Sequence, residues 1–456
     1  MRKKINFIML LVVTLTVVPG LHPEDKPGLR NVIIISVDTL RADHLSCYGY
    51  PLNTSPKINE LSRDSIRFSH CYSLTPITTP SFSTLLTSLP PHKHGAKRNG
   101  LSIYRHIQTL PSFLKESGYV TAAFISNWAL KKGLAGLHKG FDQYDEVFTR
   151  KRYMGLFSPE GEAPAVTQRA NDWLQKNHEK RFFLWVHYTE PHRPYILHKK
   201  FAFDYQDVPP SVYPPGTRMK RIKKYDSEIA YTDFYIGKLL EKIKGLGLYR
   251  DALIIFHSDH GESFGEHDYF YHGRRLYNST VHVPLLIKLP HNWLNNTVRR
   301  ENISLLDVSP TILFLLNIPL PSHMEGIPLF KAGARFLDRQ ILLETYAGTV
   351  HFKRNNKKYH LKVKPICYGI IDGSSKIIYN FKNKTVEAFR VTEDPFESKN
   401  IFIKEISTLA IKRQQLENRL ERMSKYIKYN RMYRLNEASS ISKEDLNMLK
   451  SLGYIE

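Results

Sequence analysis

Two apolar runs that each end in a carboxylate place the strongest constraint on the fold. Residues 252–256 are all apolar and lead to Asp259 and His260, and residues 32–37 are mostly apolar and lead to Asp38. Short runs rich in Ile, Val and Leu are typical of strands buried on both faces, as in a parallel sheet. Such strands bring their carboxyl ends to one edge of the sheet, where ligands bind. Asp38, Asp259 and His260 are therefore predicted to meet in a metal site.

The main part of the chain alternates between strand-like and helical patterns. Further apolar runs lie at 119–125, 182–187 and 283–289, and apolar residues recur at helical spacing within 107–117 and 225–243. This alternation predicts a mixed α/β fold with a mostly parallel central sheet flanked by helices. At 456 residues with 42% hydrophobic content, the chain is long enough to bury a large core.

The pattern changes in the last quarter of the chain. Two short runs at 367–371 and 376–380 predict a small antiparallel sheet, and residues 341–346 are a strand candidate for the main sheet. Residues 406–427 place apolar side chains on one helical face and Lys and Arg on the other. This helix is expected to pack on the body, with a membrane-surface role as the alternative. We therefore expect a catalytic domain over 30–340 and a C-terminal subdomain with a terminal helix over 341–456.

The first 22 residues have the pattern of a targeting segment. Three basic residues at 2–4 precede an apolar stretch at 5–18. A basic start followed by a stretch of this length is typical of a secretory signal peptide and is short for a transmembrane helix. We expect residues 1–22 to direct export to the periplasm or the extracellular space, with an uncleaved membrane anchor as the alternative. Three cysteines are too few for a disulfide framework.

A proline-stiffened turn at 75–81 carries several hydroxyl side chains. A threonine hydroxyl is a poor nucleophile until a metal ion or a nearby base lowers its pKa, and the predicted metal site would supply that activation. Thr78 and Thr79 are the two nucleophile candidates considered in this turn. The structural alternative is that Thr78 only caps the helix that follows.

In this order, the three segments resemble the sulfatase family of the alkaline-phosphatase superfamily. The family's first motif is matched by Val-Asp-Thr-Leu-Arg-Ala-Asp at 37–43. Its nucleophile motif is matched by Thr-Thr-Pro-Ser-Phe at 78–82, followed by Pro-His-Lys-His-Gly at 91–95. By its spacing to Pro80 and Ser81, this resemblance implies Thr78 as the nucleophile rather than Thr79. The resemblance extends from about residue 31 to the closing Leu-Gly-Tyr at 452–454. It implies a metal-dependent ester hydrolase that works by in-line attack and a covalent enzyme intermediate.

The chain departs from the family at the nucleophile. Sulfatases carry a Cys or Ser there, which is oxidised to formylglycine, and an arginine follows; this chain has Thr78 and Phe82. A threonine resembles instead the phosphodiesterases and the phosphoglycerol and phosphoethanolamine transferases of the superfamily. Where sulfatases place two cationic groups against the sulfate, this chain has Asn127 and Ala129. By the same resemblance, Asn127 is predicted to donate to a non-bridging oxygen.

The predicted ligand set also differs from that of the family. One divalent ion would be held by Asp38, Asp259 and His260 and would contact Thr78. The sulfatase pattern implies calcium, but Thr39 and His260 replace the second residue of each of its two acidic pairs. Mixed carboxylate and imidazole ligands favour zinc or manganese, whereas calcium prefers oxygen donors. We therefore expect zinc or manganese, with calcium as the alternative.

Two histidines take predicted roles from their positions in family motifs. His192 follows Pro191 in the motif that faces the leaving group and is a candidate general acid. His272 falls where sulfatases place a lysine near the scissile oxygen and is predicted to donate to an oxyanion. His187 and His267 are weaker candidates: the first is expected to be hydrogen-bonded structurally, and the second to be a loop residue or a ligand of a second metal.

The charge of the chain indicates an anionic partner. A formal net charge of +23 suits an anionic small-molecule, lipid or glycan ester, or a membrane surface, and no nucleic-acid-binding motif is present. We expect hydrolysis of a phosphodiester or phosphomonoester through Thr78. The alternatives are a sulfuric ester hydrolase and a phosphoethanolamine- or phosphoglycerol-type transferase. The non-enzyme alternative is a degenerate member that binds anionic glycans or lipid headgroups.

Overall fold

The computed structural model describes residues 29–346, apart from gaps at 149–150, 154–155, 159–161, 335 and 337–338, together with residues 365–402 and 418. The predicted signal segment at 1–22, the predicted helix at 406–427 and the closing tripeptide therefore lie outside, or almost wholly outside, the described residues. No helix within the described ranges is long and apolar enough to cross a membrane.

An eight-stranded sheet forms the centre of the molecule. Its order is β12-β2-β11-β8-β1-β7-β3-β4. The strands are β1 (Val32–Val37), β2 (Ile66–Tyr72), β3 (Val120–Ile125), β4 (Gln143–Glu146), β7 (Phe182–Tyr188), β8 (Leu253–Ser258), β11 (His282–Lys288) and β12 (Thr297–Ser304). All neighbouring pairs are parallel except those that β11 makes with β8 and β2. The prediction of a mostly parallel central sheet is confirmed.

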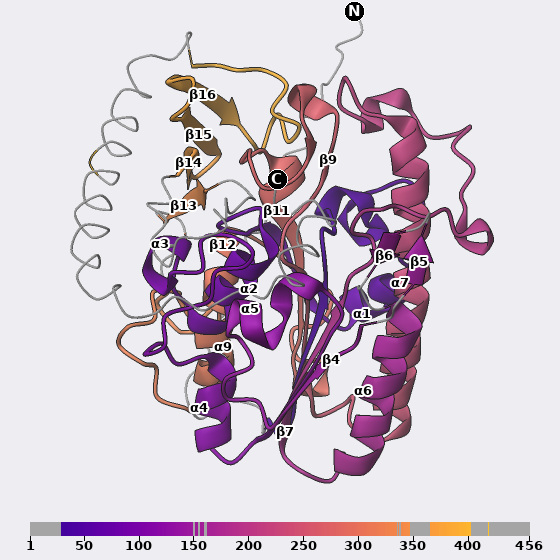
Figure 1. Ribbon diagram of the computed structural model, residues 1–456, viewed down its shortest axis with the longest axis vertical. Helices are drawn as coiled ribbons and strands as arrows, with labels where there is room; N and C mark the ends of the chain where they lie inside the picture. The colour runs from indigo at the N-terminus through magenta and orange to yellow at the C-terminus, as the bar shows by residue number, and fades with distance from the viewer. Residues whose placement is uncertain are drawn as a thin grey trace, which may run out of the picture.

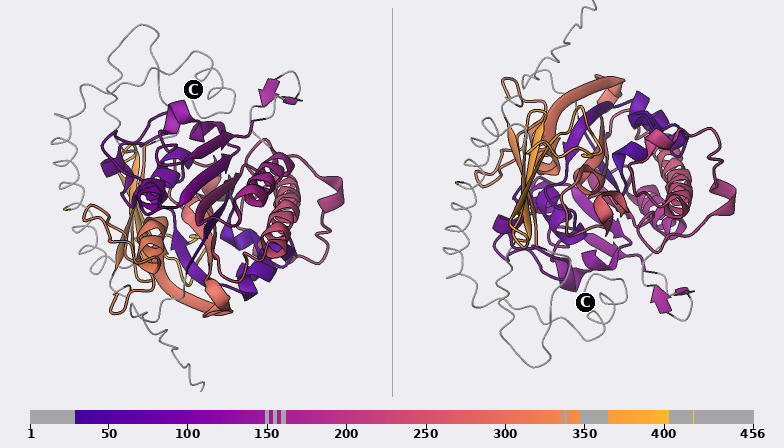
Figure 2. Two further views of the ribbon diagram at one scale, coloured as in Figure 1. Left: turned by 90° about the horizontal axis from the view of Figure 1, so that it is seen from below. Right: turned by 90° about the horizontal axis from the view of Figure 1, so that it is seen from above.

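Helices cover both faces of this sheet (Figures 1 and 2). One layer contains α1 (Pro56–Arg63), α6 (Ala163–Asn177) and α7 (Met219–Gly245), and the other contains α2 (Thr78–Thr87), α4 (Leu110–Glu116) and α9 (Val308–Leu315). Strand β1 shows why both layers form, because its alternate side chains point to opposite faces. Ile33 and Ile35 lie in the cluster under α7, whereas Val32 and Ile34 lie in the cluster under α2.

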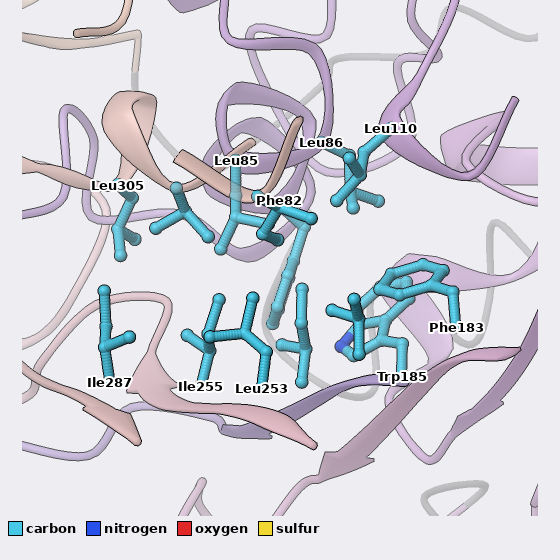
Figure 3. Packing of buried hydrophobic residues seen from close by; sticks show 14 of the residues in the cluster. Phe82, Leu85, Leu86, Leu110, Phe183, Trp185, Leu253, Ile255, Ile287 and Leu305 are labelled. Carbon is cyan, nitrogen blue, oxygen red and sulfur yellow. The ribbon is translucent and has the colours of Figure 1, made fainter. Parts of the chain in front are cut away.

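Helix α2 is held against the sheet by its apolar side chains. Phe82, Leu85 and Leu86 are buried and pack over residues of β7 and β8, including Trp185 and Ile255 (Figure 3). The ring centroids of Phe82 and Trp185 are 5.0 Å apart. Burying a large apolar side chain stabilises a fold by roughly 1.5–3 kcal/mol. This packing sets the position of the first turn of α2, where Thr78 lies.

A second sheet is built from the later part of the chain. It is antiparallel, with order β13 (Gln340–Thr345), β14 (Cys367–Asp372), β15 (Ser375–Asn380) and β16 (Thr385–Arg390). The predicted small antiparallel sheet is confirmed, and residues 341–345, a strand candidate for the main sheet, belong to this sheet instead. A strand pattern does not specify its partner, and β13 pairs along its whole length with β14.

Short elements complete the described structure. They are α3 (Pro91–His94), α5 (Lys132–Ala135), α8 (Asn278–Val281), the ribbon of β5 (Lys151–Tyr153) and β6 (Leu156–Ser158), the ribbon of β9 (Ser263–Phe264) and β10 (Phe270–Tyr271), and several 3₁₀ turns, including η4 (Trp128–Leu130). The second sheet is tied to the main body at Asn278, whose Oδ1 accepts from Lys376 Nζ at 3.0 Å and whose backbone N–H donates to Glu397. Lys376 and Glu397 themselves form a buried ion pair at 2.7 Å.

The buried His94 of α3 predicts how stability depends on pH. Its Nδ1 accepts from the Ala96 N–H at 3.1 Å and its Nε2 lies 3.2 Å from Thr84 Oγ1, so the ring is neutral. Burial lowers the pKa of His94 to about 3. Because its unfolded pKa is about 6.5, the unfolded chain takes up the proton first as pH falls, and stability is lost between pH 6.5 and 3, by on the order of a few kcal/mol.

We expect the variant His94→Gln to lose less stability than the parent over this window. Urea unfolding at a series of pH values, from 7.5 down to the lowest at which the parent remains folded, gives the free energy of unfolding of each protein. Its slope against pH is then compared between the two proteins. Equal slopes for the parent and the variant would contradict the prediction.

Candidate active site

The predicted metal residues meet at one edge of the main sheet because of strand register. Strands β1 and β8 are adjacent and parallel, and Val37 pairs with Ser258. The next residue of each strand is therefore an aspartate, Asp38 on one and Asp259 on the other. His260 follows directly, and the ligand atoms of the three residues all lie within 4.8 Å of one another. All three side chains are buried.

The hydrogen bonds around this cluster suit a divalent cation. Asp259 Oδ1 accepts from the backbone N–H groups of Thr39 (3.2 Å) and His260 (2.9 Å), which leaves Oδ2 buried without a hydrogen bond. His260 Nδ1 donates to the Gly261 carbonyl at 2.9 Å, so Nε2 presents its lone pair, 3.4 Å from Asp259 Oδ2 and 3.8 Å from Asp38 Oδ1. Ligating histidines are commonly oriented in this way.

The backbone at Thr39 is strained where it serves this cluster. Its φ is +55°, which is unusual for a β-branched residue. The turn directs the Thr39 N–H to Asp259 and the Leu40 N–H to Ser258 Oγ. Such strain is common at functional sites.

Thr78 lies beside the cluster at the start of α2. Its Oγ1 is 3.3 Å from His260 Nε2. The helix N-cap is Ile77, and no side-chain capping bond is made there, so the structure does not show the cap alternative for Thr78. The Thr79 hydroxyl instead donates to the Ala129 carbonyl at 2.7 Å. Ser81 Oγ donates to the Asp259 carbonyl at 2.7 Å and joins α2 to the loop that carries the ligands.

Asn127 contacts the cluster through Asp38. Its Nδ2 donates to Asp38 Oδ2 at 2.5 Å, and its Oδ1 accepts from the Ala129 N–H at 2.7 Å, which caps η4. The predicted bond to a substrate oxygen is not tested by these contacts. His187 Nε2 is buried without a hydrogen bond and lies 3.8 Å from Asp38 Oδ2. Burial lowers the pKa of His187 to about 3, so this ring is neutral.

The two other candidate histidines lie together beside His260. The ring centroid of His272 is 4.4 Å from that of His260 and 5.4 Å from that of His192. Burial, then the charge of neighbouring groups, lowers the pKa of His192 and of His272 well below the usual value. The structure thus brings together Asp38, Thr78, Asp259, His260, Asn127, His192 and His272, whose roles remain predictions.

His267 is not part of this group. Its ring stacks on Tyr277 with centroids 3.8 Å apart, and its Nε2 lies 3.0 Å from the Phe396 carbonyl. The described contacts place it between the main body and the segment after the second sheet, in agreement with the expected loop role.

Sequence reasoning missed Glu262, which is fully buried next to the candidate histidines. Its Oε1 lies 3.1 Å from His272 Nδ1, and its Oε2 accepts from the Tyr195 hydroxyl at 2.6 Å. Burial raises the pKa of Glu262 to about 7. The available signal was its position two residues after His260, but its partners are distant in sequence.

Comparison with known proteins identifies the families and relatives that this chain resembles. A family model described as sulfatase matches residues 30–318, and one described as N-sulphoglucosamine sulphohydrolase, C-terminal, matches residues 265–426. An ulvan-active sulfatase of Formosa agariphila is 27% identical over 68% of this chain and 66% of its own length. An N-acetylglucosamine-6-O-sulfatase of Bacteroides thetaiotaomicron is 23% identical over 94% of this chain and 92% of its own length.

Solved structures show the same fold. A protein solved in complex with its substrate D-glucosamine-2-N,6-O-disulfate superimposes with a TM-score of 0.70 at 20% identity, covering 88% of this chain and 99% of the other. A phosphonate monoester hydrolase of Agrobacterium radiobacter superimposes with a TM-score of 0.68 at 19% identity, covering 87% and 96%. A protein that holds a sulfated glucosamine and a phosphonate monoester hydrolase therefore share this architecture.

Proposed function

The chain belongs to the sulfatase family of ester-bond hydrolases, and we propose that it hydrolyses a sulfuric ester of an anionic carbohydrate through Thr78. The observation that carries the mechanism is the position of Thr78 Oγ1, 3.3 Å from His260 Nε2 at the edge of the cluster. The neighbouring Thr79 hydroxyl is not placed in this way, since it donates to the Ala129 carbonyl.

Sulfatase-family enzymes depend on a divalent metal, and the residues present fit one. Asp38, Asp259 and His260 would hold it, with Thr78 as a further contact. A bound divalent ion lowers the pKa of a hydroxyl and offsets the charge that develops on the transferred group. The donor set supports zinc or manganese, with calcium as the alternative.

The reaction has two displacements. Thr78 Oγ1 gives up its proton to solvent as it forms a bond to sulfur, the bond from sulfur to the alcohol oxygen breaks, and His192 would deliver a proton to that oxygen. Water then attacks sulfur, Thr78 Oγ1 leaves with one proton of that water, and sulfate is released as the other proton passes to solvent or back to His192. Burial lowers the pKa of His192, but a bound anionic ester would oppose that effect by favouring the charged ring.

The relatives favour a sulfuric ester over the phosphate ester expected from the sequence. Both curated relatives described above are named sulfatases, and one neighbouring structure holds a sulfated glucosamine. Phosphate esters remain the second candidate because of Thr78, Asn127 and Ala129. A threonine cannot become formylglycine, and Asn127 and Ala129 are not the cationic pair of sulfatases. The phosphonate monoester hydrolase shows that phosphorus chemistry also occurs on this fold.

Cationic side chains beside the site support an anionic substrate. The guanidinium of Arg193, next to His192, lies 4.5 Å from the ring centroid of Tyr271, and that of Arg221 lies 4.8 Å from it. Arg221 also donates to the Tyr271 hydroxyl at 3.2 Å. With the net charge of +23, these groups would attract a polyanionic glycan. Export, proposed from residues 1–22, would place the protein where such polymers occur.

A panel of matched aryl esters tests the proposal. We expect kcat/KM for the aryl sulfate, measured with the metal-loaded full chain, to exceed that for the aryl phosphodiester and the aryl phosphomonoester. The carbohydrate arm compares sulfated with desulfated glycan, and release of inorganic sulfate is the readout. Phosphoester turnover clearly above sulfate turnover would overturn the sulfuric ester proposal in favour of the second candidate.

A further inference from the structure

Glu262 makes two side-chain contacts that the proposed reaction does not yet use. Its carboxylate is fully buried, with Oε1 3.1 Å from His272 Nδ1 and Oε2 2.6 Å from the Tyr195 hydroxyl. Its backbone carbonyl accepts from Arg41 Nη1 at 3.1 Å. A buried carboxylate is costly unless its oxygens are satisfied by donors. These contacts therefore anchor Glu262 from three separate segments of the chain.

The contact to His272 specifies one tautomer of the ring. In its ionised form the Glu262 carboxylate only accepts, so the bond at Oε1 then requires a proton on Nδ1 of His272. In a neutral imidazole the other nitrogen then carries a lone pair. Tyr195 supports the arrangement, because its hydroxyl donates to Oε2 and leaves Oε1 to the ring.

The His272 ring lies among the other candidate site residues. The His272 ring packs against His260, with centroids 4.4 Å apart, and against His192, with centroids 5.4 Å apart. Nε2 is the ring nitrogen that Glu262 does not contact, since Glu262 lies against Nδ1. Which form this nitrogen takes decides whether His272 donates a hydrogen bond at the site or accepts one.

We propose that Glu262 is a positioning residue that holds His272 as the Nδ1–H tautomer, so that Nε2 presents a lone pair beside His260 and His192. His272 then accepts a hydrogen bond from a protonated group, such as the water of the second displacement, rather than donating to an oxyanion. Tyr195 contributes by fixing the Glu262 carboxylate. The tautomer follows from the contacts alone, whereas its effect on turnover rests on the proposed function.

Nitrogen NMR of the metal-loaded full chain with ¹⁵N-labelled histidine tests the proposal directly. The His272 signals are assigned by their loss in His272→Asn, and the spectra are recorded without substrate. We expect the parent to show a protonated Nδ1 and an unprotonated Nε2. Glu262→Gln should keep this tautomer, because its amide oxygen can still accept, whereas Glu262→Ala should lose it. Tyr195→Phe removes the second donor to the carboxylate, and it should weaken the preference for this tautomer less than Glu262→Ala does.

Kinetics provides the second readout. Loss of such an orienting partner commonly costs ~10–100-fold, so Glu262→Ala should lower kcat by that factor with KM nearly unchanged, and Glu262→Gln should recover part of the loss. A parent ring protonated at Nε2, or a Glu262→Ala protein that keeps the Nδ1–H form, would overturn the proposal. If no ester is turned over, the proposed function fails, while the NMR result still decides the role of Glu262.

Discussion

The variant Thr78→Ala is expected to lose ester hydrolysis almost completely, by ~10³-fold or more in kcat, because no other group forms the covalent intermediate. Thr78 Oγ1 is the hydroxyl next to His260 Nε2, and removing it leaves the metal cluster intact. We therefore expect the variant to fold and to bind metal as the parent does. Initial rates on the best ester of the panel measure the loss.

Two controls make this prediction specific. Thr79→Val removes a neighbouring hydroxyl that donates to the Ala129 carbonyl, and its kcat should fall far less than that of Thr78→Ala. Thr78→Ser keeps a hydroxyl and should keep measurable turnover. Rapid quenching followed by mass spectrometry should find the transferred group on the peptide that contains Thr78. Parental activity in Thr78→Ala would show that another group is the nucleophile.

Asp259→Asn is expected to lower the metal affinity by more than ~100-fold, with activity lost in parallel. The reason is that changes to residues that only support a ligand already lower metal affinity or activity by ~10–100-fold. The amide can still accept from the Thr39 and His260 N–H groups, so the loop should keep its shape. What is removed is the charge at Oδ2, which is buried without a hydrogen bond.

Metal content after dialysis, measured by elemental analysis, checks this prediction without reference to turnover. Asp251→Asn is the matched control, because Asp251 precedes the same strand but is exposed, and it should keep full occupancy. Chelation should inactivate the parent, and zinc, manganese and calcium can then be compared in restoring it. Full metal occupancy in Asp259→Asn would remove this residue from the ligand set.

Much of the architecture could be predicted because it depends on local patterns. The strands β1 and β8 are nearly continuous apolar runs, and such runs are expected only where both faces of a sheet are covered. Placing Asp38 and Asp259 together needed only the rule that parallel strands end at one edge. The partner of β13 could not be predicted, because apolar residues at 341–346 suit either sheet and pairing is decided by the rest of the fold.

The choice between the hydroxyls of the 75–81 turn shows which part of the site could be predicted from the sequence and which could not. Spacing favoured Thr78 over Thr79, but both are threonines in consecutive positions, and the motif alone carries no physical reason to separate them. The reason lies in the tertiary structure, where Ala129 takes the hydrogen bond of Thr79 and His260 lies beside Thr78.

The sequence by itself determined the layers of the fold, the family and the types of side chain at the sheet edge, because hydrophobic period and motif order are properties of neighbouring residues. Only the tertiary structure decided how those side chains are oriented. Tyr195 and Glu262 are 67 residues apart, and Asn127 and Asp38 are 89 apart, yet each pair shares a short hydrogen bond. Contacts of this kind depend on the packing of whole elements against one another, which local patterns do not specify.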